Sequence, residues 1–84
     1  MSQVCENVAG LVEYIVTNIV DVKEAVKIEP QESEDGNITI NVVVDESDIG
    51  HIIGRDGHII NSIRRLARAC AVKSDVHVDV EIVE

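Results

Sequence analysis

The sequence is poor in aromatic residues, in long apolar runs and in cysteine, and each shortage excludes a class of protein. Its 84 residues include one tyrosine, Tyr14, and no phenylalanine or tryptophan, so isoleucine and valine must fill the core. The longest apolar runs are only a few residues, whereas a helix needs about 20 to span a bilayer. No basic and then apolar signal segment follows Met1, so we expect a cytoplasmic protein.

The two cysteines, Cys5 and Cys70, are isolated and form no C-x-x-C pair. Isolated thiols in a cytoplasmic chain most often serve as small apolar core residues. Cys70 falls in step with Ile63 and Leu66 on one helical stripe, which predicts that it is buried. We therefore predict no disulfide, no metal site and no cofactor.

The formal net charge of −9 argues at first against a polyanionic partner. However, the charge is unevenly distributed along the chain. Residues 51–74 carry five basic side chains against one acid, a net of +4, and the remaining residues carry two lysines against fifteen acids, a net of −13. This asymmetry predicts one positive region just after a glycine-rich segment, although an ordinary amphipathic helix with a solvated arginine face is the alternative.

Apolar residues at helical spacing predict a first helix that ends near Val20–Asp21, with Ser2 as its N-cap. Two strands are predicted next, at Ala25–Glu29 and Ile38–Val44, and the acidic turn segment Pro30–Asn37 joins them as an antiparallel hairpin. Alternating valines and isoleucine predict a last strand over residues 76–82.

Between the hairpin and the last strand, the sequence predicts two further helices. The first runs from Ile49 to Ile53, is capped by Asp45 or Ser47, and ends at Gly54. The second begins after Gly57. Its apolar residues recur at helical spacing: Ile59, Ile60, Ile63, Leu66, Ala67 and Cys70. The whole chain, residues 1–84, is thus predicted to be one α+β domain of order α-β-β-α-α-β, with a three-stranded sheet covered on one face by three helices.

The two glycines three residues apart, between two helices, have a chemical consequence. Gly54 lets the first helix end in a conformation that other residues disfavour, and Gly57 lets the next helix begin abruptly. Backbone N–H groups and a helix N-terminus then meet at one exposed point, which predicts a site for the phosphates of a single nucleic-acid strand. Aliphatic side chains beside this loop are predicted to line a groove for the bases: Ile49, Ile52, Ile53 and Ile60.

The segment I-I-G-R-D-G-H-I-I, residues 52–60, resembles the signature of KH domains, in which a G-x-x-G loop clamps about four backbone nucleotides. The predicted order of elements resembles the type II arrangement of that fold. The match extends to the KhpA-like proteins (the YlqC family), which are small bacterial proteins made of this one domain. Residues 12–16, 50–59, 63–64 and 80–84 carry the resemblance, which covers nearly the whole chain.

This resemblance implies a single-stranded RNA-binding protein of the RNA-chaperone or post-transcriptional regulator type, linked in that family to cell elongation and division. It also implies pairing with a second copy or with a larger KH protein (KhpB, also called Jag or EloR). The expected RNA-binding residues are Gly54, Arg55, Asp56, Gly57, His58, Ile49, Ile52, Ile53, Ile60, Arg64 and Arg68. No catalytic arrangement of residues is recognisable, so we predict no enzyme.

Several features leave an alternative open. A carboxylate such as Asp56 about 5 Å from a phosphate costs on the order of 1 kcal/mol, although Arg55 offsets it, so we expect weak and salt-sensitive RNA binding. Asp56, the net charge and the thin core also favour a protein-interaction or dimerisation module in which RNA binding is weak. His51 and His58 beside the loop either contact RNA or are ordinary solvated residues at helix ends.

Overall fold

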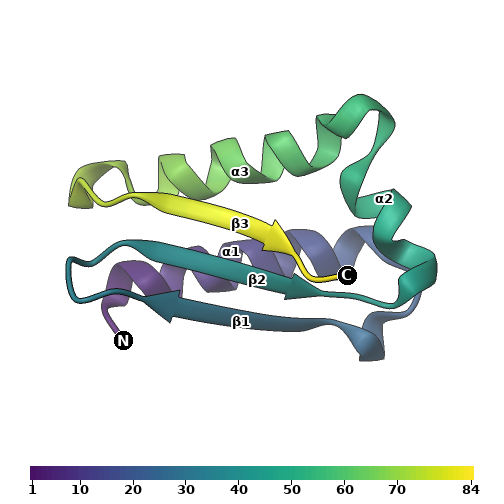
Figure 1. Ribbon diagram of the computed structural model, residues 1–84, viewed down its shortest axis with the longest axis horizontal. Coiled ribbons are helices and arrows are strands. Elements are labelled where there is room, and N and C mark those ends of the chain that lie inside the picture. Colours follow the sequence, from purple (N-terminus) through teal and green to yellow (C-terminus); the bar gives the residue numbers. More distant parts are fainter.

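The computed structural model describes all of residues 1–84 and contains three α-helices and three β-strands (Figure 1). These elements are α1 (Gln3–Ile19), β1 (Lys27–Glu32), β2 (Ile38–Val43), α2 (Ile49–Ile53), α3 (His58–Cys70) and β3 (Val78–Ile82). The observed order and class confirm the predicted α+β fold. None of the helices combines the length and apolar character that crossing a membrane requires.

The sheet has β2 at its centre, with β1 and β3 on either side. β1 pairs antiparallel with β2, with Lys27 opposite Val43, which confirms the predicted hairpin. β3 pairs parallel with β2, with Ile38 opposite Val78. A parallel neighbour requires a crossover connection, and here α2, the glycine loop and α3 form it. β3 lies at one edge of the sheet. In the sequence it comes soon after residues 51–74, the segment with a net positive charge.

The core lies between the sheet and the helices, because α1 and α3 pack against one face of the sheet (Figure 1). α2 lies at one end of this layer and contacts both of the longer helices. Along β2 the side chains alternate: Ile40 and Val42 are buried, whereas Thr39 and Asn41 are half-buried on the open face. The buried core is aliphatic apart from Cys5, as the scarcity of aromatic residues predicted.

The predicted N-cap of α1 is found, whereas Asp45 caps the 3₁₀ turn before α2 and Asp48 is the N-cap of α2 itself. The Ser2 hydroxyl oxygen accepts a hydrogen bond from the Cys5 backbone N–H at 3.2 Å, so Ser2 is the N-cap of α1. The Asp45 carboxylate accepts the Ser47 N–H at 3.0 Å and starts the short 3₁₀ turn Glu46–Asp48 that leads into α2.

The predicted bounds of the outer strands were wrong. β1 begins at Lys27 rather than Ala25 and continues through Pro30 to Glu32, into the segment predicted as a turn. The sheet tolerates Pro30 because β1 is an edge strand. Proline lacks a backbone N–H, and on an edge strand the N–H groups that face solvent have no partner in the sheet. β3 begins at Val78, two residues later than predicted, and a 3₁₀ turn (Val72–Ser74) lies between α3 and this strand.

The prediction that Cys70 is buried was also wrong. Cys70 is exposed and Leu66 is 51% exposed, whereas Ala67 and Ala71 are buried. The buried stripe of α3 runs from Ile63 through Ala67 to Ala71. Leu66 and Cys70 each precede one of the two buried alanines, so each is rotated by about 100° around the helix axis toward solvent. Only Cys5 behaves as the predicted core thiol.

Candidate nucleic-acid interface

The loop between α2 and α3 adopts a backbone that depends on Gly54. Gly54 has φ +74° and ψ 178°, a region that is essentially restricted to glycine. Its N–H donates to the Gly50 carbonyl at 2.9 Å and closes the last turn of α2. A Cβ at this position would lie 2.3 Å from Ile59 Cγ1 and 3.0 Å from the Ile59 backbone nitrogen. The residue must therefore be glycine for both conformational and steric reasons.

The next three residues turn the chain directly into α3. Asp56 has φ +55° and Gly57 has φ +76°, so two successive residues are left-handed. Aspartate is one of the few residue types other than glycine that tolerate this conformation. The Gly57 N–H donates to the Gly54 carbonyl at 3.2 Å, and the side chains of Arg55 and Asp56 are exposed. The result is a tight, projecting turn at the N-terminus of a 13-residue helix, which is where anions are favoured.

The four isoleucines predicted to line a base groove are not equally accessible. Ile52 is fully buried and Ile60 is 6% exposed, and both belong to the core beneath the loop. Ile49 and Ile53 are half-buried and retain surface beside the loop. The neighbouring Ile59 is 37% exposed. It was not singled out from the sequence as a groove residue, because its helical position alone did not separate it from the core stripe.

Arg64 and Arg68, which were predicted to add positive charge, bind the outer edge of β3. Arg64 Nε donates to the Val80 carbonyl at 3.0 Å, and Arg68 Nε donates to the Val78 carbonyl at 3.2 Å. Both arginines thereby link α3 to the last strand. No pattern in the sequence indicated that these arginines would bind backbone carbonyls of the last strand, because local residues do not show which strand a helix will cover.

The charges separate between the two sides of the molecule. The open face of the sheet, away from the helices, presents alternate residues of each strand, and its charged residues include one lysine, Lys27, and three acids, Glu29, Asp79 and Glu81. The loop and α3 carry Arg55, and also Arg64, Arg65 and Arg68. An approaching polyanion is therefore favoured at the loop and along α3 and disfavoured at the open sheet face.

The histidines beside the loop differ in their surroundings. His51 Nδ1 lies 2.9 Å from Asp48 Oδ1, and the two residues are three apart on the chain. His58, the first residue of α3, is exposed and has no such partner. The ring of His51 is therefore held by the buried carboxylate, and His58 is the histidine that is free to contact a ligand.

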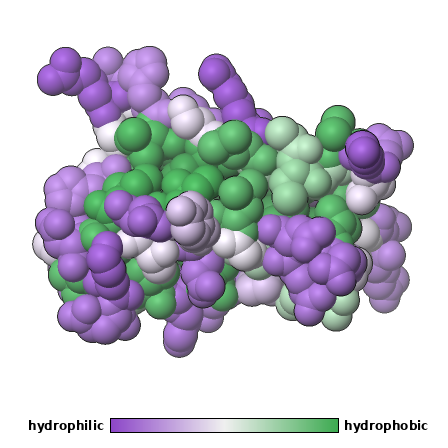
Figure 2. All heavy atoms as spheres, turned by 180° about the vertical axis from the view of Figure 1, so that it is seen from behind, coloured by the Kyte–Doolittle hydropathy of each residue, from purple (hydrophilic) through white to green (hydrophobic).

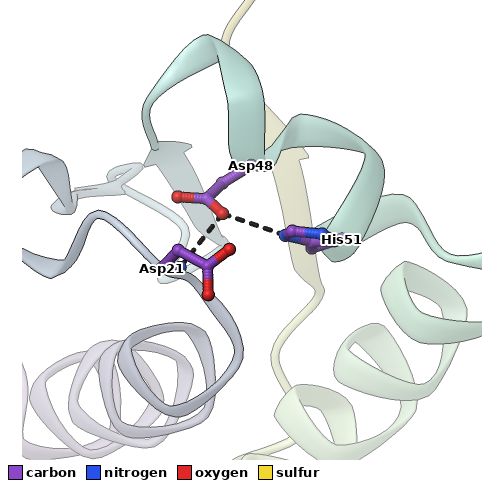
Figure 3. Close-up of side chains that lie close together, drawn as sticks. All are labelled: Asp21, Asp48 and His51. Carbon is purple, nitrogen blue, oxygen red and sulfur yellow. Dashed lines mark hydrogen bonds and ion pairs between the residues drawn. The ribbon is translucent and has the colours of Figure 1, made fainter.

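A group of possible metal ligands comprises Asp21, Asp48 and His51, whose ligand atoms lie within 4.8 Å of one another (Figure 3). The carboxylate of Asp48 is fully buried, but backbone N–H groups already occupy it. Asp21 N–H donates to Oδ1 and Val22 N–H donates to Oδ2, both at 3.0 Å. These bonds hold the pKa of Asp48 below its usual range, and His51 contributes in the same direction. They account for a buried carboxylate without a metal ion.

Comparison with known proteins identifies close relatives of this chain. The family described as KhpA/KhpB, KH domain, matches residues 9–82. The RNA-binding protein KhpA of Borreliella burgdorferi is 41% identical over 78 residues, which cover 93% of this chain and 94% of that protein. The proteins of the same name from Listeria monocytogenes and Chlamydia trachomatis are each 38% identical, over 88% and 84% of this chain and 96% and 90% of those proteins respectively.

Solved structures with the same fold include two of Era. One is Era in complex with MgGDPNP and nucleotides 1506–1542 of 16S ribosomal RNA, with a TM-score of 0.60 and 21% sequence identity. The other is a variant of Aquifex aeolicus Era bound to GDP.AlF4−, with a TM-score of 0.60 and 19% identity. The similarity covers 98% and 99% of this chain but only 32% and 33% of the length of those proteins. At this identity the similarity establishes the fold alone.

Proposed function

Because this chain belongs to the KhpA/KhpB family of KH-domain proteins, we propose that it binds single-stranded RNA through the loop Gly54–Gly57. In this proposal the loop backbone and the N-terminus of α3 bind the phosphates, and Arg55 adds an exposed positive charge. Ile49, Ile53 and His58 contact the bases beside the loop. The family is one of RNA-binding proteins rather than enzymes, and we place the activity in the cytoplasm, as a regulator or chaperone of RNA.

The observation that carries the proposal is the conformation of the loop. Gly54 and Gly57 both have positive φ, and the turn between them lies at the start of α3 with the Arg55 and Asp56 side chains exposed. Such a turn lets a phosphate approach backbone N–H groups closely, which a side chain at either glycine would prevent. The concentration of arginines on α3 supports the same site, since phosphate binding is dominated by electrostatics.

The affinity is expected to be modest. Asp56 places a carboxylate in the middle of the loop, and the chain as a whole carries a net charge of −9. We infer that its left-handed backbone explains the presence of an acid at this position, because aspartate adopts that conformation more readily than lysine or arginine. Asp56 therefore favours the geometry of the loop but weakens its attraction for phosphate. We expect RNA binding to weaken steeply as the salt concentration rises.

Opposite charge changes in the loop test this proposal. Arg55→Asp should weaken binding of a short single-stranded RNA by about tenfold at low salt, because it replaces an attractive charge with a repulsive one. Asp56→Asn keeps a residue that tolerates the left-handed backbone and should strengthen binding by about three- to fivefold. Fluorescence anisotropy at several salt concentrations measures both effects, which should shrink as salt rises.

Lys27→Asp provides the matched control, because it makes the same charge change on an exposed residue of β1, on the sheet rather than at the loop. We expect it to change RNA affinity less than about twofold at moderate salt. Equal weakening by Lys27→Asp and Arg55→Asp would mean that net charge, and not the loop, governs binding.

A second candidate function is self-association through the helical side of the molecule. Figure 2 shows a broad apolar area on the side opposite to the view of Figure 1. On α3, Ile59, Leu66 and Cys70 are exposed and share one stripe, and Tyr14 of α1 is 70% exposed. Apolar surface of this kind on a small domain is a common feature of protein interfaces. We propose a second copy of the chain, or a larger KH protein of the same family, as the partner.

Leu66→Glu tests the self-association. Because Leu66 is 51% exposed in the single chain, the substitution should leave the melting temperature of a monomer nearly unchanged while placing a charge in the centre of the proposed interface. Light scattering at micromolar concentration should give a dimer for the wild type and a monomer for the variant. A wild-type protein that remains monomeric throughout the concentration range would exclude this function.

A further inference from the structure

The outer edge of β3 is covered by arginine side chains instead of by another strand. β3 pairs with β2 on one side only, and an open strand edge exposes carbonyl and N–H groups that attract other strands. Arg64 and Arg68 lie one helical turn apart on α3 and bind the carbonyls of Val80 and Val78. They therefore protect the edge and fix two guanidinium groups along it.

Each guanidinium group keeps hydrogen-bonding capacity. An arginine has five N–H donors. Arg64 uses Nε for the Val80 carbonyl and one hydrogen of Nη1 for Asn61 Oδ1 at 3.2 Å. Arg68 uses Nε for Val78 and one hydrogen of Nη2 for Asp79 at 3.4 Å. Arg64 is the more buried of the two, since Arg64 is half-buried and Arg68 is exposed, and its partner Asn61 belongs to the same helix.

Arg64 lies within reach of an RNA strand held at the loop. It follows Gly57 by seven residues, which is about 10 Å along α3. A loop of this kind clamps about four backbone nucleotides, so a strand that leaves the loop along α3 and β3 places one of its bases over Arg64.

The local charges favour contact with a base rather than with a phosphate. Asp79 and Glu81 alternate with the residues whose carbonyls the arginines bind, so acids and arginines are interleaved at this edge. The acids offset part of the arginine charge here, so a phosphate gains less at this edge than it does elsewhere on α3. Guanine fits the mixed surface, because its O6 and N7 atoms accept paired N–H donors from arginine, and its N1 and N2 groups donate.

We propose that Arg64 is a specificity-determining residue that selects guanine at the RNA position over the β3 edge. The inference rests on the RNA-binding function proposed above and adds a base preference to it. The fixed Nε and Nη1 bonds hold the guanidinium plane, and the remaining Nη donors bind O6 and N7 of the base. Adenine offers a donor where guanine has O6, and the pyrimidines lack N7, so none of them makes the paired contact.

The test uses short oligouridine strands that carry a single guanine at each position in turn. One position should bind about five- to tenfold more tightly than oligouridine, the lower part of the range for a paired arginine–guanine contact. Inosine, which keeps O6 and N7, should retain most of this gain at that position, and 7-deazaguanine, which lacks N7, should lose most of it. Arg64→Lys should reduce the ratio of guanine to uridine affinities to about one, because lysine cannot make the paired contact.

Arg65→Lys is the matched control, because Arg65 is exposed and makes no hydrogen bond to β3. It should preserve the guanine preference. Thermal melting of both variants monitors the fold, and oligouridine binding monitors the loop.

Equal affinity for guanine and uridine at every position, with oligouridine still bound, would overturn the assignment of Arg64 and leave the RNA-binding function intact. A guanine preference that survives Arg64→Lys would also overturn it. Absence of any RNA binding by the folded protein would instead overturn the proposed function itself.

Discussion

Gly54→Ala should lower the melting temperature by about 10–20 °C, which corresponds to roughly 2–3 kcal/mol for a domain of this size. The backbone of Gly54, at φ +74° and ψ 178°, is strained for any other residue. The added Cβ would also overlap Ile59 at 2.3 Å, and Ile59 is fixed at the start of α3. Thermal unfolding followed by circular dichroism measures the loss. RNA binding should fall together with stability, because the same backbone is proposed to form the phosphate site.

Two other glycines provide graded controls for this substitution. Gly57→Ala should cost only about 1–2 kcal/mol, because φ is +76° but the nearest atom to the new Cβ is 3.5 Å away. Gly10→Ala, in the middle of α1 with open space around it, should raise stability by about 0.5–1 kcal/mol. A Gly54→Ala protein as stable as the wild type would mean that the loop does not adopt this conformation in solution.

Asp48→Ala should produce the second large loss, lowering the melting temperature by about 10 °C or more. Asp48 is fully buried, and its carboxylate joins the end of α1 to the start of α2 (Figure 3). Removal of the side chain leaves the N–H groups of Asp21 and Val22 without their acceptors, and His51 loses the partner that orients it. Asp48→Asn should cost less, because the amide retains one acceptor oxygen.

The stabilisation by Asp48 should depend on pH in one direction. Because the two N–H donors hold its pKa in the folded protein below the ordinary aspartate value of 3.8, the unfolded chain binds this proton more readily than the folded one. The contribution is therefore complete above the unfolded pKa and is lost as pH falls through the lower, folded value. Denaturant titrations at a series of acidic pH values measure it.

The comparison of wild type with Asp48→Asn isolates this contribution, because other carboxyls behave in the same way. Hydrogen bonds from Ser2 lower the pKa of Glu32, and hydrogen bonds from Ser47 lower the pKa of Asp45. We expect the stability difference between the two proteins to shrink on acidification. A difference that stays constant down to the acid unfolding transition would contradict the role of the ionised carboxylate.

The alternative function differs from RNA binding in the surface it uses. The loop projects from the junction of α2 and α3, whereas the exposed apolar residues Tyr14 and Leu66 lie along the middle of α1 and α3. A dimer centred on Tyr14 and Leu66 would leave the loop of each copy available, and two loops on one particle would increase the avidity for a longer RNA. The Leu66→Glu variant should bind a short RNA normally and a long RNA less tightly.

Local patterns in the sequence determined the elements and the glycine loop. The apolar spacing of residues 4–19 indicates a helix, the alternation of residues 38–44 indicates a strand, and the positive φ angles fall at Gly54 and Gly57, as the breaks in the helical pattern predicted. These features depend on the spacing of apolar side chains and on the backbone conformations that glycine allows. Both are properties of a few neighbouring residues, so the sequence alone is enough to predict them. The family signature lies in the same local segment.

Contacts between distant residues were decided only by the tertiary structure. The sequence places Arg64 and Arg68 on one face of a helix, but only the parallel alignment of β3 brings the carbonyls of Val80 and Val78 to them. In the sequence, Asp48 is one of several acids before a helix, and nothing distinguishes it from the others. In the folded chain it is buried, and its carboxylate accepts the N–H groups of Asp21 and Val22. The choice between Leu66 and Ala67 for the core likewise depended on a rotation of α3 that packing against the sheet fixes. Local chemistry therefore specified the kind of site, and the packing of helices on the sheet specified which side chains surround it.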